Sequence, residues 1–335
     1  MLILFLSTLV FAGKKASLGG FDGFVERMGA ATRELSRGNT GSADTSAMPG
    51  AYWNPGILGF RGGLSYTLHG ERRDLDRSGG SLGLEGRVAG RMGIGAALLY
   101  RGDYNFDVIS EDDENLGTAS PYFMMGYVGL GYRISRKDGL GVSFSFSYDN
   151  LDIGRYYNDA GLVDSYRSPV TLGLGWIRQW NSNWSSSVVI RNLSFSSNLS
   201  ARWDKNTGNN NSLTASEGLR PKVLQIGLGY RSRVFNRPIS VWMEALDYQM
   251  ADTLLVFDPD FHLWTARAGF EYEIFPRGMV RLGMDDSNYS LGFGYRFEIR
   301  IGKTVLPFDI SYALVYESEA ELWNPLSFGV RGWIL

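Results

Sequence analysis

Residues 140–149 read LGVSFSFSYD, a stretch in which apolar and polar side chains alternate. Phe144, Phe146 and Tyr148 fall on every second position, with serines between them. Side chains at positions i and i+2 of a β-strand point to the same side of the sheet. The period of two therefore predicts a strand that has one apolar face and one polar face.

The same alternation recurs from residue 62 to the end of the sequence. Strands that cross a membrane in a barrel carry this weak dyad pattern over about ten residues each. The fourteen segments that show it lie near residues 62–70, 80–89, 93–102, 120–134, 140–149, 168–180, 185–196, 220–232, 239–247, 262–275, 278–284, 288–299, 305–317 and 325–335.

The connections between these segments alternate in length. The short links are 90–92, 135–139, 181–184, 234–238, 276–277 and 302–303. The longer, mostly polar links include 103–119, 149–167, 197–219 and 248–261. An even number of antiparallel strands, with short turns at one end and long loops at the other, is typical of outer-membrane barrels.

A soluble β-sandwich also has alternating strands, but its polar face meets water and ordinarily carries Lys, Thr and Glu. Here the polar face is mainly Gly and Ser, and Gly makes up 43 of 335 residues. Charges are scattered on that face at Glu85, Arg87, Arg267, Glu271, Glu273, Arg296, Glu298, Asp309 and Arg331. Tyr and Phe recur near the ends of the apolar rows, as in the aromatic girdles of membrane barrels. We therefore predict an all-β fold, a 14-stranded antiparallel transmembrane β-barrel, in residues 62–335.

Composition excludes several other classes of protein. The formal net charge of −2 argues against a nucleic-acid partner, which needs a clustered basic surface. The absence of cysteine excludes disulfides and thiol chemistry. No stretch after residue 12 is apolar for the roughly 20 residues of a membrane helix, so a membrane crossing must use strands.

The long loops carry most of the acidic side chains and the short turns mainly carry basic ones. Glu111, Asp112 and Asp113 exemplify the loops, whereas Arg136 and Lys137 exemplify the turns. We place the acidic loops outside the cell and the basic turns in the periplasm. The plainer interpretation is that all of these charges are simply solvated.

Residues 1–12, MLILFLSTLVFA, form an apolar run that ends in Val-Phe-Ala, which resembles a signal-peptide cleavage site. The run is too short to span a bilayer. The positively charged residues that normally begin a signal peptide are missing. Either the chosen start codon lies too far downstream or the signal peptide is an unusually minimal one. A buried N-terminal strand is the alternative. We predict a signal peptide, and with it export to a bacterial outer membrane.

The stretch 41–58, GSADTSAMPGAYWNPGIL, lacks both helix and strand periodicity and contains a turn at 53–56. Eight strands give a lumen that wall side chains fill, and sixteen give an open channel. Fourteen strands leave a space that Gly and Ser cannot close. We predict that residues 13–61 fold into the lumen as a plug, with their backbone groups against polar wall charges rather than lipid.

The predicted plug and fourteen strands resemble the FadL-like barrels of fatty-acid and hydrocarbon uptake, and within them the PorV/PorQ family. The family pattern appears at 28–31, 44–47 and 52–58, read as MGAA, DTSA and YWNPGIL. Residues 48–50 lengthen the usual gap, and the alanine between Pro and Gly is absent. Asn192 and Leu193 also match the family near the seventh strand. The plug-motif residues are Asp44, Ser46, Ala47, Trp53, Asn54, Pro55 and Gly56.

Little in the sequence indicates an enzyme. His69 and His262 are the two histidines, both near the predicted outer ends of strands, and a lone loop histidine is more often solvated than catalytic. The acidic run 110–115 lacks the glycine and the spacing of a calcium loop. We predict a protein that is not an enzyme and has no cofactor or metal.

Two functions remain. The resemblance to PorV implies a secretion accessory that binds exported proteins or a translocon through its outer loops. The alternative is a FadL-like channel for hydrophobic small molecules. Aromatic and aliphatic side chains among polar loop residues favour the first, although they could equally line an entry groove. The candidate partner or ligand residues are Tyr156, Tyr157, Trp203, Leu255, Phe257 and Trp323. A continuous apolar lumen would favour transport, and a plug sealed by charge pairs would favour a scaffold.

Overall fold

The computed structural model describes residues 29–73, 77–102, 105–109, 114–150, 165–167, 170–194, 199–202, 214–215, 221–249, 262–286, 288–301, 304–318 and 322–334. The predicted signal peptide at 1–12 lies outside these ranges, as do residues 13–28 of the predicted plug. None of the described helices is long and apolar enough to cross a membrane.

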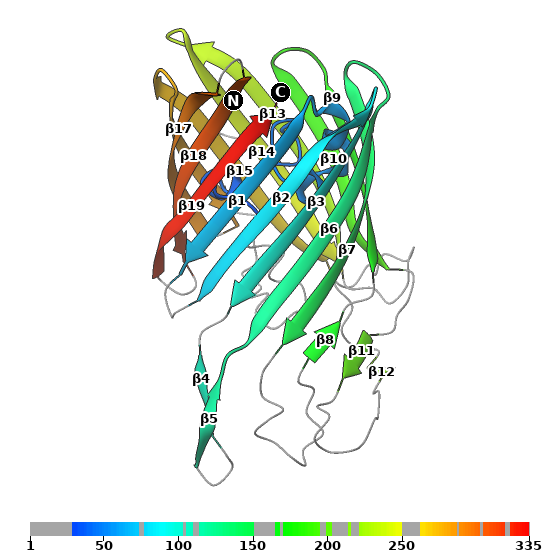
Figure 1. The fold of residues 1–335 in the computed structure, drawn as a ribbon, viewed down its shortest axis with the longest axis vertical. Coiled ribbons are helices and arrows are strands. Elements are labelled where there is room, and N and C mark those ends of the chain that lie inside the picture. The colour runs from blue at the N-terminus through cyan, green and yellow to red at the C-terminus, as the bar shows by residue number, and fades with distance from the viewer. Residues whose placement is uncertain are drawn as a thin grey trace.

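Fourteen antiparallel strands form a closed barrel (Figure 1), as predicted. They are β1 (Leu64–Arg72), β2 (Ser78–Ala89), β3 (Met92–Gly102), β6 (Tyr122–Arg133), β7 (Asp138–Asn150), β9 (Thr171–Gln179), β10 (Trp184–Ser194), β13 (Lys222–Val234), β14 (Arg237–Gln249), β15 (His262–Phe275), β16 (Gly278–Asp285), β17 (Asn288–Ile301), β18 (Thr304–Glu317) and β19 (Leu322–Ile334). The ladder from Leu64↔Ile334 to Arg72↔Leu326 pairs β1 with β19 and closes the barrel. Closure leaves the wall without a free edge.

The alternation that predicted the strands decides which side chains face outward. In β7, Leu140, Phe144 and Phe146 are exposed on the outer surface, whereas the serines between them are buried on the inner side. Exposed apolar side chains follow the same outer rows in the neighbouring strands. A belt of this kind suits the hydrocarbon of a bilayer, while the inner rows meet a polar interior.

The long connections contain structure that we did not predict. Within 103–119, β4 (Phe106–Ile109) and β5 (Asn115–Ala119) pair as a separate hairpin. Three further short strands, β8 (Ser165–Arg167), β11 (Leu199–Arg202) and β12 (Thr214–Ala215), extend the sheet beyond the barrel. These strands have two to five residues. A period of two cannot be recognised in so few positions.

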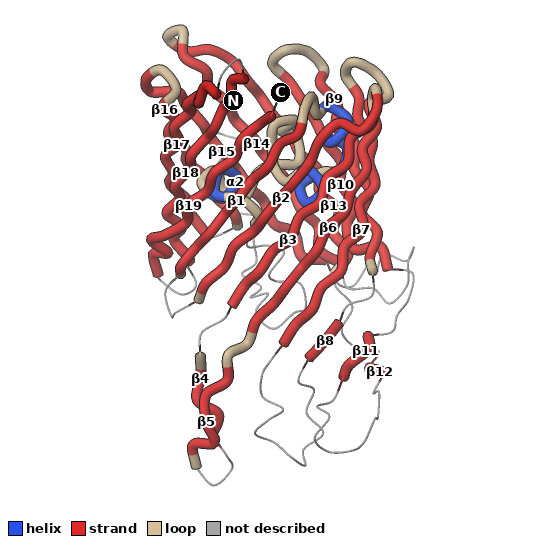
Figure 2. The backbone as a smooth tube through the Cα atoms, in the orientation of Figure 1, coloured by secondary structure: helices blue, strands red, loops and turns tan. Residues whose placement is uncertain are grey.

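Residues 29–61, which we call the N-terminal segment, contact the inner side of the wall and are almost all buried. The segment contains α2 (Thr32–Leu35), α3 (Gly50–Trp53) and the 3-10 helix η2 (Pro55–Phe60). Figure 2 shows these helices inside the barrel, toward the end that carries the short turns. We expected neither helix nor strand in 41–58, and helices of four to six residues are too short to give a periodic signal.

Candidate functional site

Residues 50–60 lie against a part of the wall whose inward positions are glycines. A Cβ atom added to Gly141 would come well under 3.0 Å from backbone atoms of Pro55 and Gly56, and one added to Gly131 would do the same with Pro55 and Gly59. Only glycine lets two backbones approach this closely. We call this surface the first glycine patch: Gly93, Gly95, Gly129, Gly131, Gly139, Gly141 and Gly175.

Residues 32–40 lie on a similar surface on the other half of the barrel. A Cβ atom on Gly283 would overlap the backbone of Arg37 and Gly38, and one on Gly292 would overlap the side chain of Ser36. The second glycine patch consists of Gly269 in β15, Gly283 in β16, Gly292 in β17 and Gly329 in β19. Part of the glycine on the polar face of the strands therefore accommodates the N-terminal segment.

Asp44 of the plug motif joins three arginines. Its Oδ2 lies 3.0 Å from Nη1 of Arg33 and 2.7 Å from Nη1 of Arg37, and its Oδ1 pairs with Arg231 of β13. Burial raises the pKa of Asp44, but the charges of Arg37, Arg33 and Arg231 more than offset it and hold that pKa well below its ordinary value. Asp44 is therefore an ionised group that ties two parts of the segment to the wall.

Two wall carboxylates accept hydrogen bonds from the backbone of the segment. Glu244 of β14 accepts from the N–H of Gly41 at 2.9 Å and from the N–H of Ser42 at 2.7 Å. Glu85 of β2 accepts from the N–H of Gly50 at 2.7 Å and pairs with Arg61 at 2.6 Å. Bonds to an ionised acceptor are roughly twice as strong as neutral ones. These bonds satisfy backbone groups that no helix or strand would satisfy.

A further ion pair connects the segment to β15, and others connect the wall strands β15–β19 to one another. Arg33 donates to both oxygens of Glu271, through Nε at 3.0 Å and Nη2 at 3.1 Å. Glu271 also lies 2.6 Å from Nε of Arg281. Asp309 pairs with Arg331 at 2.9 Å and with Arg296 at 3.3 Å. Buried pairs of this kind fix geometry strongly, because removing one partner leaves the other charge uncompensated.

Trp53 of the plug motif is completely buried, and its carbonyl accepts from Nη2 of Arg191 at 2.8 Å. The guanidinium of Arg191 also lies 5.5 Å from the ring centre of Tyr52. Arg191 belongs to β10, where the register with β9 shifts between Ile190 and Leu193. An extra residue in one strand redirects side chains. The irregularity covers Arg191 and Asn192, and it directs the arginine onto the segment.

Asn54 is an extended residue between α3 and η2. Its Oδ1 accepts from the N–H of Gly56 at 2.9 Å, and its Nδ2 donates to the carbonyl of Ser42 at 2.9 Å and to that of Trp176 in β9 at 3.1 Å. One amide therefore caps a helix, links two parts of the segment and binds the wall.

We expect Asn54→Ala to destabilise the docking of residues 50–60 by about 3 kcal/mol, since each lost hydrogen bond contributes about 1 kcal/mol. Amide hydrogen exchange of these residues in the folded barrel should accelerate. Asn115→Ala is the matched control, because Asn115 makes the same bond to the N–H of Gly117 in an exposed hairpin. Unchanged exchange in Asn54→Ala would refute the role assigned to its amide.

The seven predicted plug-motif residues lie together in this segment. Ser46 donates to Asp44 at 2.7 Å, and the carbonyl of Ala47 accepts from Arg61. Of the predicted loop residues, five lie outside the described ranges: Tyr156, Tyr157, Trp203, Leu255 and Phe257. Trp323 is in β19, but its side chain is not among those described. Their role in binding stays a prediction.

His69 is not the solvated residue that we expected. It lies near the end of β1, as predicted, but it is buried, with Nδ1 2.7 Å from Oγ1 of Thr32 and Nε2 3.5 Å from Glu71. The order hydroxyl, histidine, carboxylate is that of an activated nucleophile. Thr32, however, is only 1% exposed, so a substrate could not reach its hydroxyl. Within the described ranges, no three His, Asp or Glu side chains form a candidate metal site.

Toward the long loops, several inward-facing side chains are apolar. Leu99 of β3 and both Phe123 and Met125 of β6 are buried in one cluster with Tyr52 of the segment. A second cluster lies on β13 and β14 and consists of Val223, Leu246 and Tyr248. The described lumen thus carries ion pairs near the short turns and also near the long loops, where Arg73 and Arg101 pair with Glu71, and its two apolar clusters lie toward the long loops.

Sequence reasoning found part of this site. It identified Glu85, Glu271, Asp309 and Arg331 as charges on the polar face of strands, but it did not predict their partners. It missed Arg33 and Arg37 altogether, as well as Glu244. Wall residues such as Glu244 can be recognised in the sequence as charges at inward positions of a strand. For the two arginines, the available signal was their position just before the plug motif.

No protein-family model matches this sequence, and no curated protein matches it either. Solved structures do. The toluene transporter TbuX of Ralstonia pickettii matches with a TM-score of 0.54 and 15% identity, over 91% of this chain and 96% of that one. The P. putida toluene transporter TodX matches with a TM-score of 0.55 and 11% identity, over 91% and 97%. The monoaromatic hydrocarbon channel CymD matches with a TM-score of 0.54 and 12% identity, over 92% and 98%.

These likenesses agree with the broad resemblance to FadL-like barrels that the sequence indicated. They give no support to the narrower resemblance to the PorV/PorQ family. All three are to hydrocarbon transporters or channels, and they support no assignment to the PorV/PorQ family. At identities of 11–15% they establish the fold. The chain therefore has the fold of these proteins, a closed barrel of fourteen antiparallel strands.

Proposed function

We propose that the protein is a bacterial outer-membrane channel through which small hydrophobic molecules cross. The observation that carries the proposal is the agreement of fold over nine-tenths of the chain with proteins described as toluene transporters and a monoaromatic hydrocarbon channel. Fold alone does not fix function, because one fold can host several activities. The proposal therefore also needs a route through the barrel.

The apolar side chains in the long-loop half of the lumen support such a route. Leu99, Phe123 and Met125 point inward from adjacent strands and offer an apolar wall. Sites for small hydrophobic ligands are lined mainly by side chains of this kind. These side chains are buried in one cluster with Tyr52 of the N-terminal segment, so a molecule entering from the long loops would reach them only once the segment shifts. In this proposal, the segment is the closure that must shift for release.

A secretion scaffold is the second candidate, and one observation favours it. The N-terminal segment is held by charge pairs, through Asp44, Glu85 and Glu271, which is the feature we associated with a scaffold. The matched structures favour the channel, since none of the three is described as a secretion protein. Ion pairs near the short turns are also compatible with a closed channel. We therefore give the channel precedence.

Uptake of radiolabelled toluene by cells carrying the protein in the outer membrane tests the channel. Wild type should exceed the empty vector, and Met125→Glu should reduce the increment more than tenfold, because an unpaired charge in an apolar passage costs several kcal/mol and about 1.4 kcal/mol is already tenfold. Leu98→Met, on the outer face of β3, is the control and should transport normally. Uptake equal to that of the empty vector would refute the channel. Stoichiometric co-purification of a translocon or exported proteins from the same membranes would establish the scaffold.

A further inference from the structure

A cavity of about 290 Å³ lies between the N-terminal segment and strands β13–β17. Its wall residues come from the short-turn ends of these strands, among them Pro238 at the start of β14 and Met279 at the start of β16. The cavity is therefore at the end of the lumen opposite to the long loops. It is close in size to the smallest pockets that hold small ligands.

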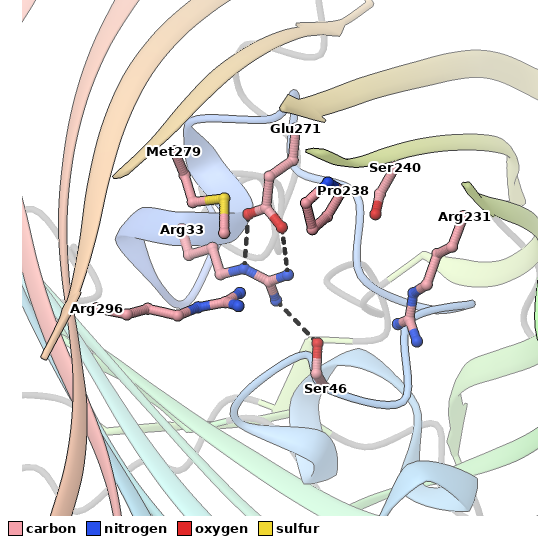
Figure 3. Close-up of a pocket in the computed structure, with 8 residues that line it drawn as sticks. All are labelled: Arg33, Ser46, Arg231, Pro238, Ser240, Glu271, Met279 and Arg296. Carbon is pink, nitrogen blue, oxygen red and sulfur yellow. Dashed lines mark hydrogen bonds and ion pairs between the residues drawn. The ribbon is translucent and has the colours of Figure 1, made fainter. Parts of the chain in front are cut away.

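Three arginines line this cavity (Figure 3). Arg296 and Arg231 extend toward it from opposite sides, and Arg33 lies between them. The guanidinium of Arg33 is fully engaged with Glu271, Asp44 and Ser46. Glu271 is the acidic residue in the lining, and Arg33 and Arg281 both pair with it.

The two outer arginines have donors left over. Arg231 pairs with Asp44 through Nη2, and its side chain is 38% exposed. Arg296 pairs with Asp309 through Nε, and its side chain is 44% exposed. A guanidinium has five N–H donors in a planar fork. Each of these two arginines therefore presents further N–H groups toward the cavity.

The charges connected to this site do not balance. Among the described residues, the linked ion pairs contain six arginines and four carboxylates, an excess of two positive charges. The arginines are Arg33, Arg37, Arg231, Arg281, Arg296 and Arg331, and the carboxylates are Glu34, Asp44, Glu271 and Asp309. Arg231 and Arg296 are the exposed members of this network, and both line the cavity.

We propose that this cavity binds a small oxyanion, a carboxylate or a phosphate group, between Arg231 and Arg296. Planar guanidinium forks match the geometry of both anions and bind them through paired N–H donors. The hydroxyl of Ser240 adds a polar group to the lining, while Met279 and Pro238 offer an apolar surface for the rest of a compact organic anion. The site does not depend on what crosses the barrel, and it goes beyond the channel function proposed above.

A neutral hydrocarbon does not explain this arrangement. An apolar ligand would leave the N–H groups of Arg231 and Arg296 without acceptors while excluding water from them, which costs free energy. An oxyanion supplies acceptors and neutralises the excess charge. The cavity would also admit water, whose share of liquid volume is roughly 30 Å³ per molecule. Binding of anions must therefore be measured directly.

Isothermal titration of the purified barrel in detergent at low ionic strength, with benzoate, inorganic phosphate and neutral benzamide as probes, tests the site. Benzoate or phosphate should bind and benzamide should not. Arg231→Gln and Arg296→Gln should each weaken the binding about tenfold, in line with the loss of one charged hydrogen bond. Arg233→Gln is the matched control, since Arg233 lies two residues further along β13, is exposed, and does not line the cavity.

Ser240→Glu provides a variant that removes no arginine. It places a carboxylate inside the cavity, and we expect it to abolish anion binding while the heat-modifiable barrel stays intact. Binding of benzoate alone would indicate a carboxylate ligand, and binding of phosphate alone a phosphate ligand. The proposal is overturned if neither anion binds at 10 mM, roughly the weakest affinity a specific site would show. An effect of Arg233→Gln equal to that of the lining arginines would overturn it as well.

Discussion

Gly141→Val combined with Gly283→Val should increase the ion conductance of the barrel about tenfold in planar bilayers. The first substitution places a Cβ atom well under 3.0 Å from the backbone of Pro55, and the second does so with the backbone of Gly38. Backbone atoms cannot rotate away as a side chain can, so the N-terminal segment must leave both glycine patches. A lumen of this width without the segment is expected to conduct ions, as the lumens of somewhat larger barrels do.

The barrel itself should tolerate these substitutions, because valine favours strands. Gly70→Val is the matched control, since a Cβ atom on Gly70 meets nothing within 4 Å. Sensitivity of cells to vancomycin, which is too large for a closed barrel, gives a second readout. A folded double variant with the conductance of wild type would show that the patches do not hold the segment.

Asp44→Asn should release the segment by a different route. The substitution removes the negative charge that Arg33, Arg37 and Arg231 share, and breaking a buried ion pair on one side costs about 3–5 kcal/mol. Docking should weaken by that amount. Trypsin, added to the folded barrel in detergent, should then cut after Arg33 and Arg37, which are buried in the wild type.

Asp107→Asn serves as the control, because Asp107 is an exposed residue of β4 that bonds to Thr118. Its digestion pattern should match that of the wild type. If Asp44→Asn also resists trypsin at both arginines, then the ion pairs are dispensable and the glycine patches alone dock the segment. The two sets of variants therefore separate backbone contact from charge.

The barrel could be predicted from the sequence because its signal is repeated. The period of two recurs along the barrel strands. At residues such as Phe144 and Phe146 it also indicates which side chains face outward. The helices α2 and α3 have four residues each and repeat nothing. The same reasoning explains why the short strands in the long connections were missed.

The site could be predicted only in part, because strand periodicity assigns a residue to a face and not to a partner. Glu271 and Arg331 were recognised as inward charges, but Arg33, which pairs with the first, comes from a segment without periodicity. The sequence likewise placed glycines on the polar face without indicating what they contact. An inward glycine such as Gly141 and a turn glycine look alike until a second backbone is found against the first.

The two glycine patches divide the chain by order of synthesis. Every member of the first patch precedes residue 180, whereas every member of the second follows residue 260. The strands up to β10 therefore carry the whole glycine surface under residues 50–60 and none of the one under residues 32–40. Residues 32–40 acquire theirs only with β15–β19, the last of which also pairs with β1. The N-terminal segment thus spans the seam at which the barrel closes and links the first strands of the barrel to the last ones.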